Sequence, residues 1–191
     1  MCAVERSEKG MEFFMKIYVI RHGETDVNLE NRMNSLNDDD LNKTGIMQAK
    51  EVGKKLEKIN YDFIISSPLI RTKHTAELLN IKNKKINYDN RLIERDAGIF
   101  TKQSLENIDS DDWWNLNPKE DYKDAETVKN VLDRIFEFLD ELKKKYKDET
   151  ILLVTHGGTS KAISCYFNGI PADGNLEKYK HNNCEIHEFN L

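Results

Sequence analysis

The amino-acid sequence predicts an α/β fold, a three-layer α/β/α sandwich with a mostly parallel central sheet. Short apolar runs alternate along the chain with longer amphipathic patterns, which is the order typical of βαβ units. The runs at 16–20 and 150–155 are apolar at nearly every position, as strands covered on both faces are. A length of 191 residues suits one domain around one hydrophobic core.

Four segments are predicted strands because they are short and rich in apolar, β-branched or aromatic residues. They are residues 16–20, 61–66, 150–155 and 184–190. The last segment alternates apolar and polar residues, so we expect it at an edge of the sheet. Two sets of apolar residues at helical spacing predict helices that cover the sheet. The sets are Ile46, Ala49, Val52 and Leu56, and Val128, Val131, Leu132, Ile135, Leu139 and Leu142.

Two segments do not follow this alternation. Residues 99–124 contain two adjacent tryptophans and a proline among acidic and amide residues, and we expect a small insertion over one end of the sheet. Residues 1–14 show no usable period, and we expect an N-terminal extension outside a domain formed by residues 15–191.

Composition excludes several classes of partner. The formal net charge of -5 argues against a broad electrostatic surface for nucleic acid or anionic lipid. The apolar runs are too short to span a membrane, and three cysteines without paired spacing suggest neither a disulfide framework nor a metal site. We therefore expect a cytoplasmic protein that needs no metal and no cofactor, whose oligomeric state the sequence leaves open.

Two predicted strands end in the same kind of residue. The first strand continues into Arg21 and His22, and the strand at 150–155 continues into His156 and Gly157. In open α/β sheets, ligands bind beyond the carboxyl ends of the strands. These side chains are therefore expected at one common mouth.

Two further charged residues are expected at the same mouth. Arg71 lies in the first turn of a helix that follows the strand at 61–66, where the positive end of the helix favours an anion. Glu94 supplies a carboxylate shortly before Gly98. The planar guanidinium of arginine matches phosphate oxygens, and a histidine between two cations is kept neutral and nucleophilic because like charges lower its pKa.

At these residues the sequence resembles the histidine phosphatase superfamily, the phosphoglycerate-mutase-like family, and within it the phosphatase branch. The motif "RHGET" carries the resemblance, which covers nearly everything from Lys16 to Asn190. It implies that His22 becomes phosphorylated, that Glu94 is the proton donor and that His156 assists. The implied phosphate-binding residues are Arg21, Asn28, Arg71 and His156, and the implied substrate contacts are Thr25, Arg32 and Gly157.

The chain departs from the family pattern around the mouth rather than in the phosphate pocket. Asn34, Ser35 and Asp40 stand where glutamine, glycine and proline are common, and Lys102 stands where a glycine often follows the Glu94 segment. These differences are expected to affect the choice of substrate and to leave the chemistry unchanged.

The resemblance and the residues together predict a metal-independent phosphomonoesterase that hydrolyses a small phosphorylated metabolite through a phosphohistidine intermediate. A phosphoglycerate mutase is the alternative, although the stretch from Glu94 to His156 is short for the insertion that excludes water in mutases. An inactive module that binds phosphorylated ligands is the third possibility, but pure binding would not require Glu94.

The remaining candidates have structural explanations. His74, His181 and His187 have no partner spaced to orient them, so surface or edge positions are expected. The acidic run at 38–40 is expected to be loop surface rather than a cation site, because one cluster without further ligands is weak evidence.

Overall fold

The computed structural model describes residues 15–191, and the expected extension at residues 1–14 lies outside the described residues. Within the described part, five strands form one sheet in the order β3-β2-β4-β1-β5. They are β1 (Lys16–Arg21), β2 (Phe63–Ser66), β3 (Ile86–Tyr88), β4 (Thr150–Thr155) and β5 (Ile186–Asn190). Only β5 runs antiparallel, beside β1 at one edge, so the predicted mostly parallel sheet is confirmed.

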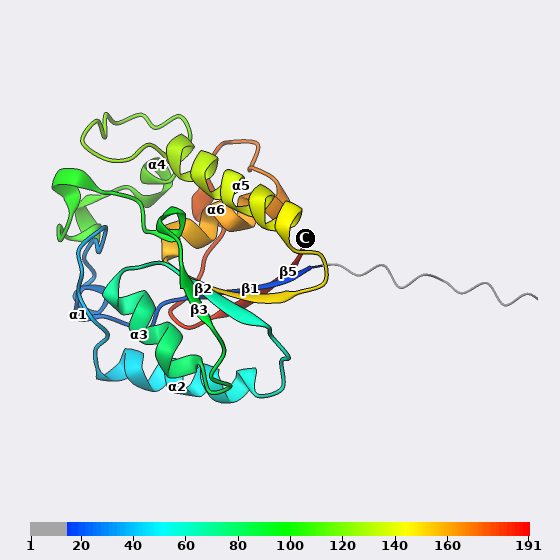
Figure 1. Cartoon of the computed structure of the whole chain (residues 1–191). Coiled ribbons are helices and arrows are strands. Elements are labelled where there is room, and N and C mark those ends of the chain that lie inside the picture. The colour runs from blue at the N-terminus through cyan, green and yellow to red at the C-terminus, as the bar shows by residue number, and fades with distance from the viewer. Residues whose placement is uncertain (1–14) are drawn as a thin grey trace, which may run out of the picture.

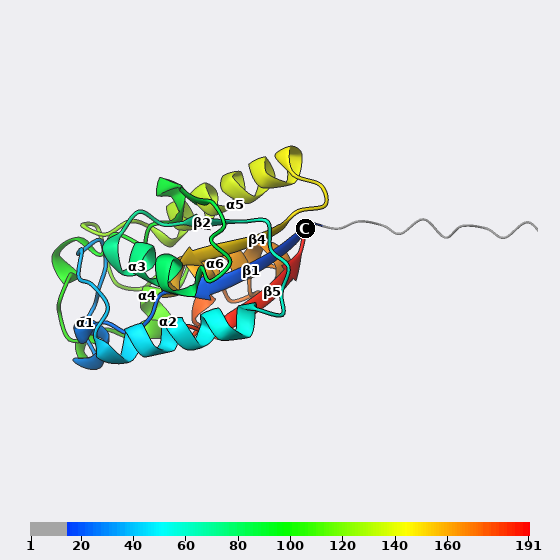
Figure 2. The same ribbon diagram turned by 60° about the horizontal axis from the view of Figure 1, so that its bottom comes forward.

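Helices cover both faces of the sheet, as Figures 1 and 2 show. The α-helices are α1 (Asp26–Leu29), α2 (Lys43–Leu56), α3 (Ile70–Leu79), α4 (Ser110–Trp113), α5 (Val128–Lys145) and α6 (Gly157–Asn168). Short 3-10 helices are η1 (Asn90–Leu92), η2 (Gly98–Phe100), η3 (Leu105–Asn107) and η4 (Leu176–Lys178). The helices α2 and α3 lie on one face and α5 and α6 on the other, which confirms the three layers.

The core consists of two clusters because each central strand buries both of its sides. In β1, Ile17 and Val19 join the cluster under α5 and α6, whereas Tyr18 and Ile20 join the cluster under α2 and α3. The two predicted helical faces are buried, except that Ile46 is only half-buried. This double burial explains why the strand sequences read as continuous apolar runs.

The strands differ from the sequence prediction at several positions. The strand β1 ends at Arg21 and not at residue 20, and β2 starts at Phe63 and not at residue 61. The strand β3 was not predicted, because its three residues carry only one apolar aliphatic side chain, and it pairs with β2 at an edge. The strand β5 starts at Ile186 and not at residue 184, because Cys184 has a φ of 57°. A left-handed residue cannot continue an extended strand.

The carboxyl ends of β1, β2 and β4 point to the end of the molecule where α1 and the loops around α4 lie, away from the C-terminus (Figure 2). The insertion predicted at 99–124 forms η3, α4 and their connecting loops there. No helix within residues 15–191 is long and apolar enough to cross a membrane.

Candidate active site

A cavity of about 230 Å³ opens at the end of the sheet where the carboxyl ends of β1, β2 and β4 lie. Its wall includes six of the residues that the sequence singled out, namely Arg21, His22, Asn28, Arg32, Glu94 and Gly157. Arg71 and His156 are fully buried beside His22 and do not reach the cavity surface. The structure thus brings the predicted strand-end residues together at one mouth.

His22 is held at the end of β1 in one defined orientation. Its backbone N–H donates to the carbonyl of Thr155 at the end of β4, and its Nδ1–H donates to the carbonyl of Gly23 at 2.7 Å. Because a carbonyl only accepts, Nδ1 carries the proton and Nε2 carries the lone pair. Burial, and then the charges of Arg71 and Arg21, hold the pKa of His22 well below its usual range, so the ring is neutral.

Arg71 is fixed by backbone carbonyls rather than by carboxylates. Its Nη1 and Nη2 donate to the carbonyls of Asn37 (2.5 Å) and Ser35 (2.7 Å), and its Nε lies 3.3 Å from Nε2 of His22. Burial lowers the pKa of Arg71 to about 10, which leaves the guanidinium charged at neutral pH. A buried guanidinium whose hydrogen bonds within residues 15–191 go to no carboxylate favours an anion in the adjoining cavity.

His156 and Arg21 each leave one buried nitrogen unpaired. His156 Nε2 is hydrogen-bonded to Oγ of Ser67 at 2.8 Å, whereas its Nδ1 has no partner among residues 15–191. Arg21 donates from Nη1 to the carbonyl of His181, whereas its Nε has no partner in the same part of the chain. Buried polar atoms are normally satisfied, so two unpaired nitrogens next to His22 mark a place for ligand oxygens.

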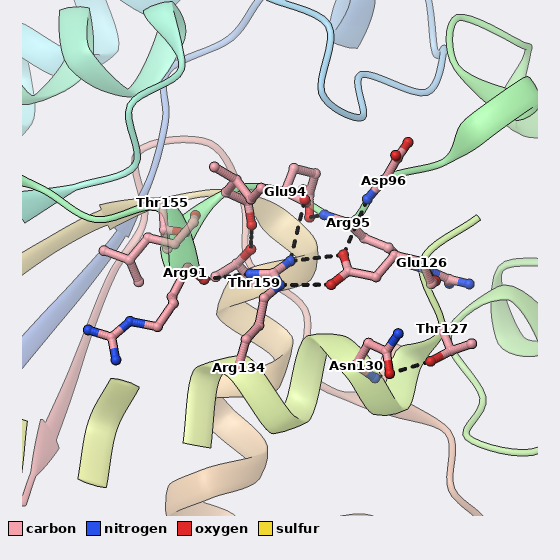
Figure 3. A network of polar contacts seen from close by, with 12 residues as sticks. Arg91, Glu94, Arg95, Asp96, Glu126, Thr127, Asn130, Arg134, Thr155 and Thr159 are labelled. Carbon is pink, nitrogen blue, oxygen red and sulfur yellow. Dashed lines mark hydrogen bonds and ion pairs between the residues drawn. The ribbon is translucent and has the colours of Figure 1, made fainter. Parts of the chain in front are cut away.

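The backbone around Glu94 is anchored from the layer of α5 and α6 (Figure 3). Arg134 on α5 donates to the carbonyls of Arg91 (2.5 Å) and Glu94 (3.4 Å), and Thr159 on α6 donates to the carbonyl of Ile93 (2.6 Å). Glu94 lies in a loop without regular structure, so these bonds supply the rigidity that a helix or strand would otherwise give.

The Glu94 carboxylate points into the cavity wall beside the start of α6. Its Oε2 accepts from the N–H of Gly158 at 3.1 Å, and its Oε1 accepts from the N–H of Arg95 at 2.9 Å. A Cβ on Gly158 would lie 2.5 Å from Oε1 and 2.0 Å from the Trp114 ring. Glycine at this position therefore permits both the carboxylate and the tryptophan to approach the helix.

The residues implied as further contacts divide into two groups. Asn28, Arg32 and Gly157 line the cavity, whereas Thr25 is completely buried as the N-cap of α1. The Thr25 hydroxyl donates toward the side-chain oxygens of Asn28 and Asn34. Thr25 thus lies next to Asn28 and shapes this wall without being exposed on it.

The expectation of a surface or edge position was wrong for His181. This residue is only 6% exposed and lines the cavity, because the segment after η4 folds back against α6 and Nε2 of His181 hydrogen-bonds to Oγ of Ser164 at 2.8 Å. Burial, followed by His187 and Lys161, lowers the pKa of His181 to about 3. The sequence around it, "KHNNC", carries no apolar signal from which burial could be predicted.

The acidic run lies at the loop surface as expected, yet each carboxylate has a specific partner. Asp38 accepts from the N–H of Ile70 at the start of α3, Asp39 lies 3.6 Å from Lys102, and Asp40 pairs with His74 at 2.8 Å. No group of metal-binding side chains occurs within residues 15–191. The run therefore fastens the loop that holds Arg71.

The insertion supplies cavity residues that the motifs did not indicate. Leu105, Ile108, Trp113 and Trp114 line the cavity, as do Lys161 on α6 and Glu177 in η4. The two tryptophans were the available signal for the insertion, whereas nothing distinguished Lys161 and Glu177 from surface charges.

The insertion is joined to the loop after α1. The N–H of Lys102 donates to the carbonyl of Met33 at 2.8 Å, and the N–H of Met33 donates to the carbonyl of Gln103 at 2.9 Å. Ser35 and Lys102, which stand where the family often has glycine, have φ angles of 52° and 63°. The two departures from the family thus keep a backbone conformation that suits glycine.

This fold, with a neutral histidine and two arginines at the carboxyl ends of its strands, defines an enzyme of phosphoryl transfer, a phosphoric monoester hydrolase or mutase. A family model described as "Histidine phosphatase superfamily (branch 1)" matches residues 17–191, and the chain belongs to this superfamily. The resemblance noted in the sequence is therefore confirmed.

Known relatives carry both kinds of activity in their names. The chain is 31% identical over 163 residues to phosphoserine phosphatase 1 of Hydrogenobacter thermophilus, with 82% of this chain and 77% of the relative covered. It is 30% identical to a probable phosphoglycerate mutase GpmB of Salmonella arizonae, with 83% and 77% covered. Among solved structures, a phosphoserine phosphatase of Entamoeba histolytica in complex with 3-phosphoglyceric acid superposes with a TM-score of 0.79 at 26% identity, covering 92% of this chain and 90% of that one.

Proposed function

We propose that the protein is a metal-independent phosphomonoesterase that hydrolyses a small phosphorylated metabolite through a phosphohistidine on His22. The observation that carries the proposal is the neutral His22 ring, whose Nε2 lone pair faces Arg71 at 3.3 Å beside the unpaired buried nitrogens of Arg21 and His156. A nucleophile that is unprotonated and already flanked by fixed cations meets the two requirements of attack on a phosphate monoester.

In the proposed first step, Nε2 of His22 attacks phosphorus and the bond from phosphorus to the leaving oxygen breaks. Glu94, in its acid form, gives its proton to that oxygen, so an alcohol departs. Arg21, Arg71, Asn28 and His156 receive the three remaining phosphate oxygens, and the fixed charges stabilise the transferring group.

In the proposed second step, water attacks the phosphohistidine from the side that the alcohol has left. The Glu94 carboxylate takes the proton of that water, the nitrogen–phosphorus bond breaks, and phosphate and the free imidazole are regenerated. The Gly158 N–H, which donates to Glu94 at 3.1 Å, keeps the carboxylate in place in both steps.

The test is release of free phosphate from a panel of phosphorylated metabolites, with p-nitrophenyl phosphate included as an undemanding substrate. We expect activity to persist in excess EDTA and to be inhibited by vanadate, which resembles the pentacoordinate phosphorus of the transition state. Complete loss in EDTA with recovery on adding magnesium would contradict the metal-independent mechanism.

The same assay separates hydrolysis from mutase activity. A mutase would move phosphate between positions of a phosphoglycerate, with a bisphosphorylated primer, faster than it releases free phosphate. We expect the reverse ratio, and transfer that outruns hydrolysis would assign the site to the mutase class.

A further inference from the structure

A buried ion pair forms part of the cavity wall beside the proposed catalytic residues. Lys161 Nζ lies 3.0 Å from Glu177 Oε2, and the two side chains are only 10% and 21% exposed. Both residues line the cavity that also contains His22 and Glu94. Charged side chains are rarely this buried unless each is compensated, and the mechanism proposed above uses neither of them.

The position of Lys161 on α6 connects it to residues that contact Arg21 and Glu94. Lys161 follows Gly157 and Gly158 by four and three residues, so the three share one face of the helix. Gly157 lies against the Arg21 guanidinium, since a Cβ there would be 3.3 Å from Cζ of Arg21. Gly158 carries the N–H that binds Glu94. The backbone of Lys161 is therefore about one helical turn, roughly 5.4 Å, further along α6 than the glycines that contact Arg21 and Glu94.

Trp114 indicates that the Lys161 side chain turns back toward these glycines. The ammonium lies 5.7 Å from the centre of the Trp114 ring, and the same ring covers Gly158. Helical side chains lean toward the start of their helix, which agrees with this contact. The tryptophan and the ion pair thus line the cavity that also contains His22 and Glu94.

The ion pair retains one donor and one acceptor for a ligand. Lys161 has three N–H donors, of which one is directed to Glu177 and a second, at 3.4 Å, to the carbonyl of Tyr179. Its third donor has no partner within residues 15–191. In the same part of the chain, Oε1 of Glu177 accepts no hydrogen bond. A ligand that bears both a carboxylate and an ammonium complements such a pair.

We propose that Lys161 and Glu177 select an O-phosphorylated α-amino acid as the substrate, an inference that depends on the phosphatase function proposed above. The carboxylate of the amino acid binds the Lys161 ammonium, and its α-ammonium binds the Glu177 carboxylate. A hydroxy acid would bring a second anion next to Glu177 without the compensating cation, and an amine without a carboxylate would leave Lys161 unused. The cavity of about 230 Å³ suits a substrate of this small size.

The other cations of the cavity are less suited to this task. Arg32 is exposed and donates to the carbonyl of Lys102 and to Glu30. Arg95 is buried against Trp113 and donates to the carbonyls of Trp113 and Glu126. Of these cavity cations, Lys161 is the one that shares a face of α6 with Gly157 and Gly158, the residues that contact Arg21 and Glu94.

The experiment compares kcat/KM for four substrates that differ in the two charged groups. Phosphoserine has both groups, 3-phosphoglycerate replaces the ammonium by a hydroxyl, phosphoethanolamine lacks the carboxylate, and p-nitrophenyl phosphate has neither. We expect phosphoserine to exceed 3-phosphoglycerate and phosphoethanolamine by about tenfold or more, because sites built to bind a charged group discriminate against analogues that lack it.

Variants then assign the preference to the pair. Lys161→Met should lower kcat/KM for phosphoserine and 3-phosphoglycerate by about tenfold or more and spare p-nitrophenyl phosphate, whereas Lys161→Arg should recover part of the loss. Glu177→Gln should weaken phosphoserine and phosphoethanolamine, the two substrates that carry the ammonium, and remove the advantage of phosphoserine over 3-phosphoglycerate. Lys178→Met is the matched control, because Lys178 makes an exposed ion pair with Asp173 and should change none of the four values.

The possible outcomes separate this inference from the proposed function. If the protein hydrolyses p-nitrophenyl phosphate but does not prefer phosphoserine, the inference is wrong and the phosphatase function stands. If it hydrolyses none of the four substrates, the phosphatase function itself is wrong. Equal losses on all four substrates in Lys161→Met and Glu177→Gln, with a lower melting temperature, would show that the pair is structural and would overturn the inference.

Discussion

The two walls of the cavity are built in different ways. The wall proposed to bind phosphate, called the phosphate wall, presents Arg21 and His22 to the cavity, with Arg71 and His156 buried behind them. His22, Arg71 and His156 are at most 2% exposed and lie at the ends of β1 and β4 or in the first turn of α3. The leaving-group wall consists mainly of loops, residues 29–42 and 98–125, in which the helices have at most four residues. The phosphate wall is thus part of the core, whereas the leaving-group wall is made of loops that pack against the core.

The difference suits the phosphate wall to the proposed chemical steps and the leaving-group wall to the choice of substrate. Side chains at strand ends inherit the rigidity of the sheet, which suits groups that must meet phosphorus in one geometry. Loops tolerate change without loss of the core, which suits the recognition of different alcohols. The walls are nevertheless linked, because the carbonyls that orient Arg71 belong to Ser35 and Asn37 in the loop.

The largest effect is expected from breaking the phosphate wall at its nucleophile. His22→Ala should abolish turnover and prevent formation of an acid-labile phosphoenzyme, because it removes the proposed nucleophile, the Nε2 atom that accepts from Nε of Arg71 at 3.3 Å. The measurement is acid-quench trapping of labelled phosphate alongside steady-state turnover. A variant that still traps phosphate would move the nucleophile to another residue.

The next effect concerns Glu94, which lies where the two walls meet. Glu94→Gln keeps the shape and the acceptor for Gly158 but cannot deliver a proton, so it should slow an alkyl phosphate by about a hundredfold or more. The first step with p-nitrophenyl phosphate should be nearly spared, because p-nitrophenolate leaves without protonation.

A burst of p-nitrophenol followed by slow turnover should then be visible in stopped-flow absorbance, since the same carboxylate is proposed to activate water in the second step. Equal losses on alkyl and aryl phosphates without a burst would remove Glu94 from the role of acid. An acidic residue of the leaving-group wall would take its place.

The third effect is a pH dependence of the free energy of unfolding, which arises from histidines that are buried in their neutral form. His181 has a pKa of about 3 in the folded protein, against a usual value near 6.5 in the unfolded chain. Below about pH 6.5 the unfolded chain therefore binds a proton that the folded protein does not, so the free energy of unfolding falls as the pH falls. Between pH 7 and pH 5 this histidine alone should lower it by about 2 kcal/mol.

Urea denaturation at the two pH values measures this loss. His22 and His156, whose pKa values are also held well below the usual range, should add to it in the same direction. His181→Gln should reduce the difference between the two pH values by about 2 kcal/mol. An unchanged pH dependence in His181→Gln would show that His181 becomes charged in the folded state.

The sequence predicted the phosphate wall well because its residues follow patterns that the backbone itself imposes. The runs at 16–20 and 150–155 are apolar because the strands are buried on both faces. The polar residues that follow these runs must therefore lie at the carboxyl ends of the strands. The positions of Arg21, His22 and His156 therefore followed from local pattern alone.

The leaving-group wall was predicted only in outline because its contacts join distant parts of the chain. The pairing of residues 33 and 102, the return of His181 to the cavity, and the ion pair of Lys161 with Glu177 each depend on how loops fold back on the core. Charged and amide residues in such loops read as solvated surface, since neither period nor composition marks the few that become buried.

The smallest net effects on stability should come from two glycine substitutions in the leaving-group wall, because relief of the backbone conformation partly offsets the losses. Lys102→Gly relieves a left-handed conformation that costs a side-chain-bearing residue about 1–2 kcal/mol, offset by about 0.4–1 kcal/mol for the freer unfolded chain. The Lys102 ion pair with Asp39 is 3.6 Å long and half-exposed, so its loss matters little. We expect a gain in unfolding free energy of up to about 1 kcal/mol and unchanged catalysis.

Ser35→Gly relieves the same kind of backbone conformation but should have the opposite result. The Ser35 hydroxyl accepts from the N–H of Ala97 at 2.8 Å, and Ala97 is fully buried, so its N–H would lose its partner at a cost of about 1–3 kcal/mol. Because Ala97 follows Glu94 closely and the Ser35 carbonyl holds Arg71, kcat should fall several-fold as well. Urea midpoints and kcat, measured for both variants, test whether the loop is coupled to the phosphate wall. If both substitutions stabilise and leave kcat unchanged, the loop is not coupled to the phosphate wall; opposite signs would show that one hydroxyl connects the two walls.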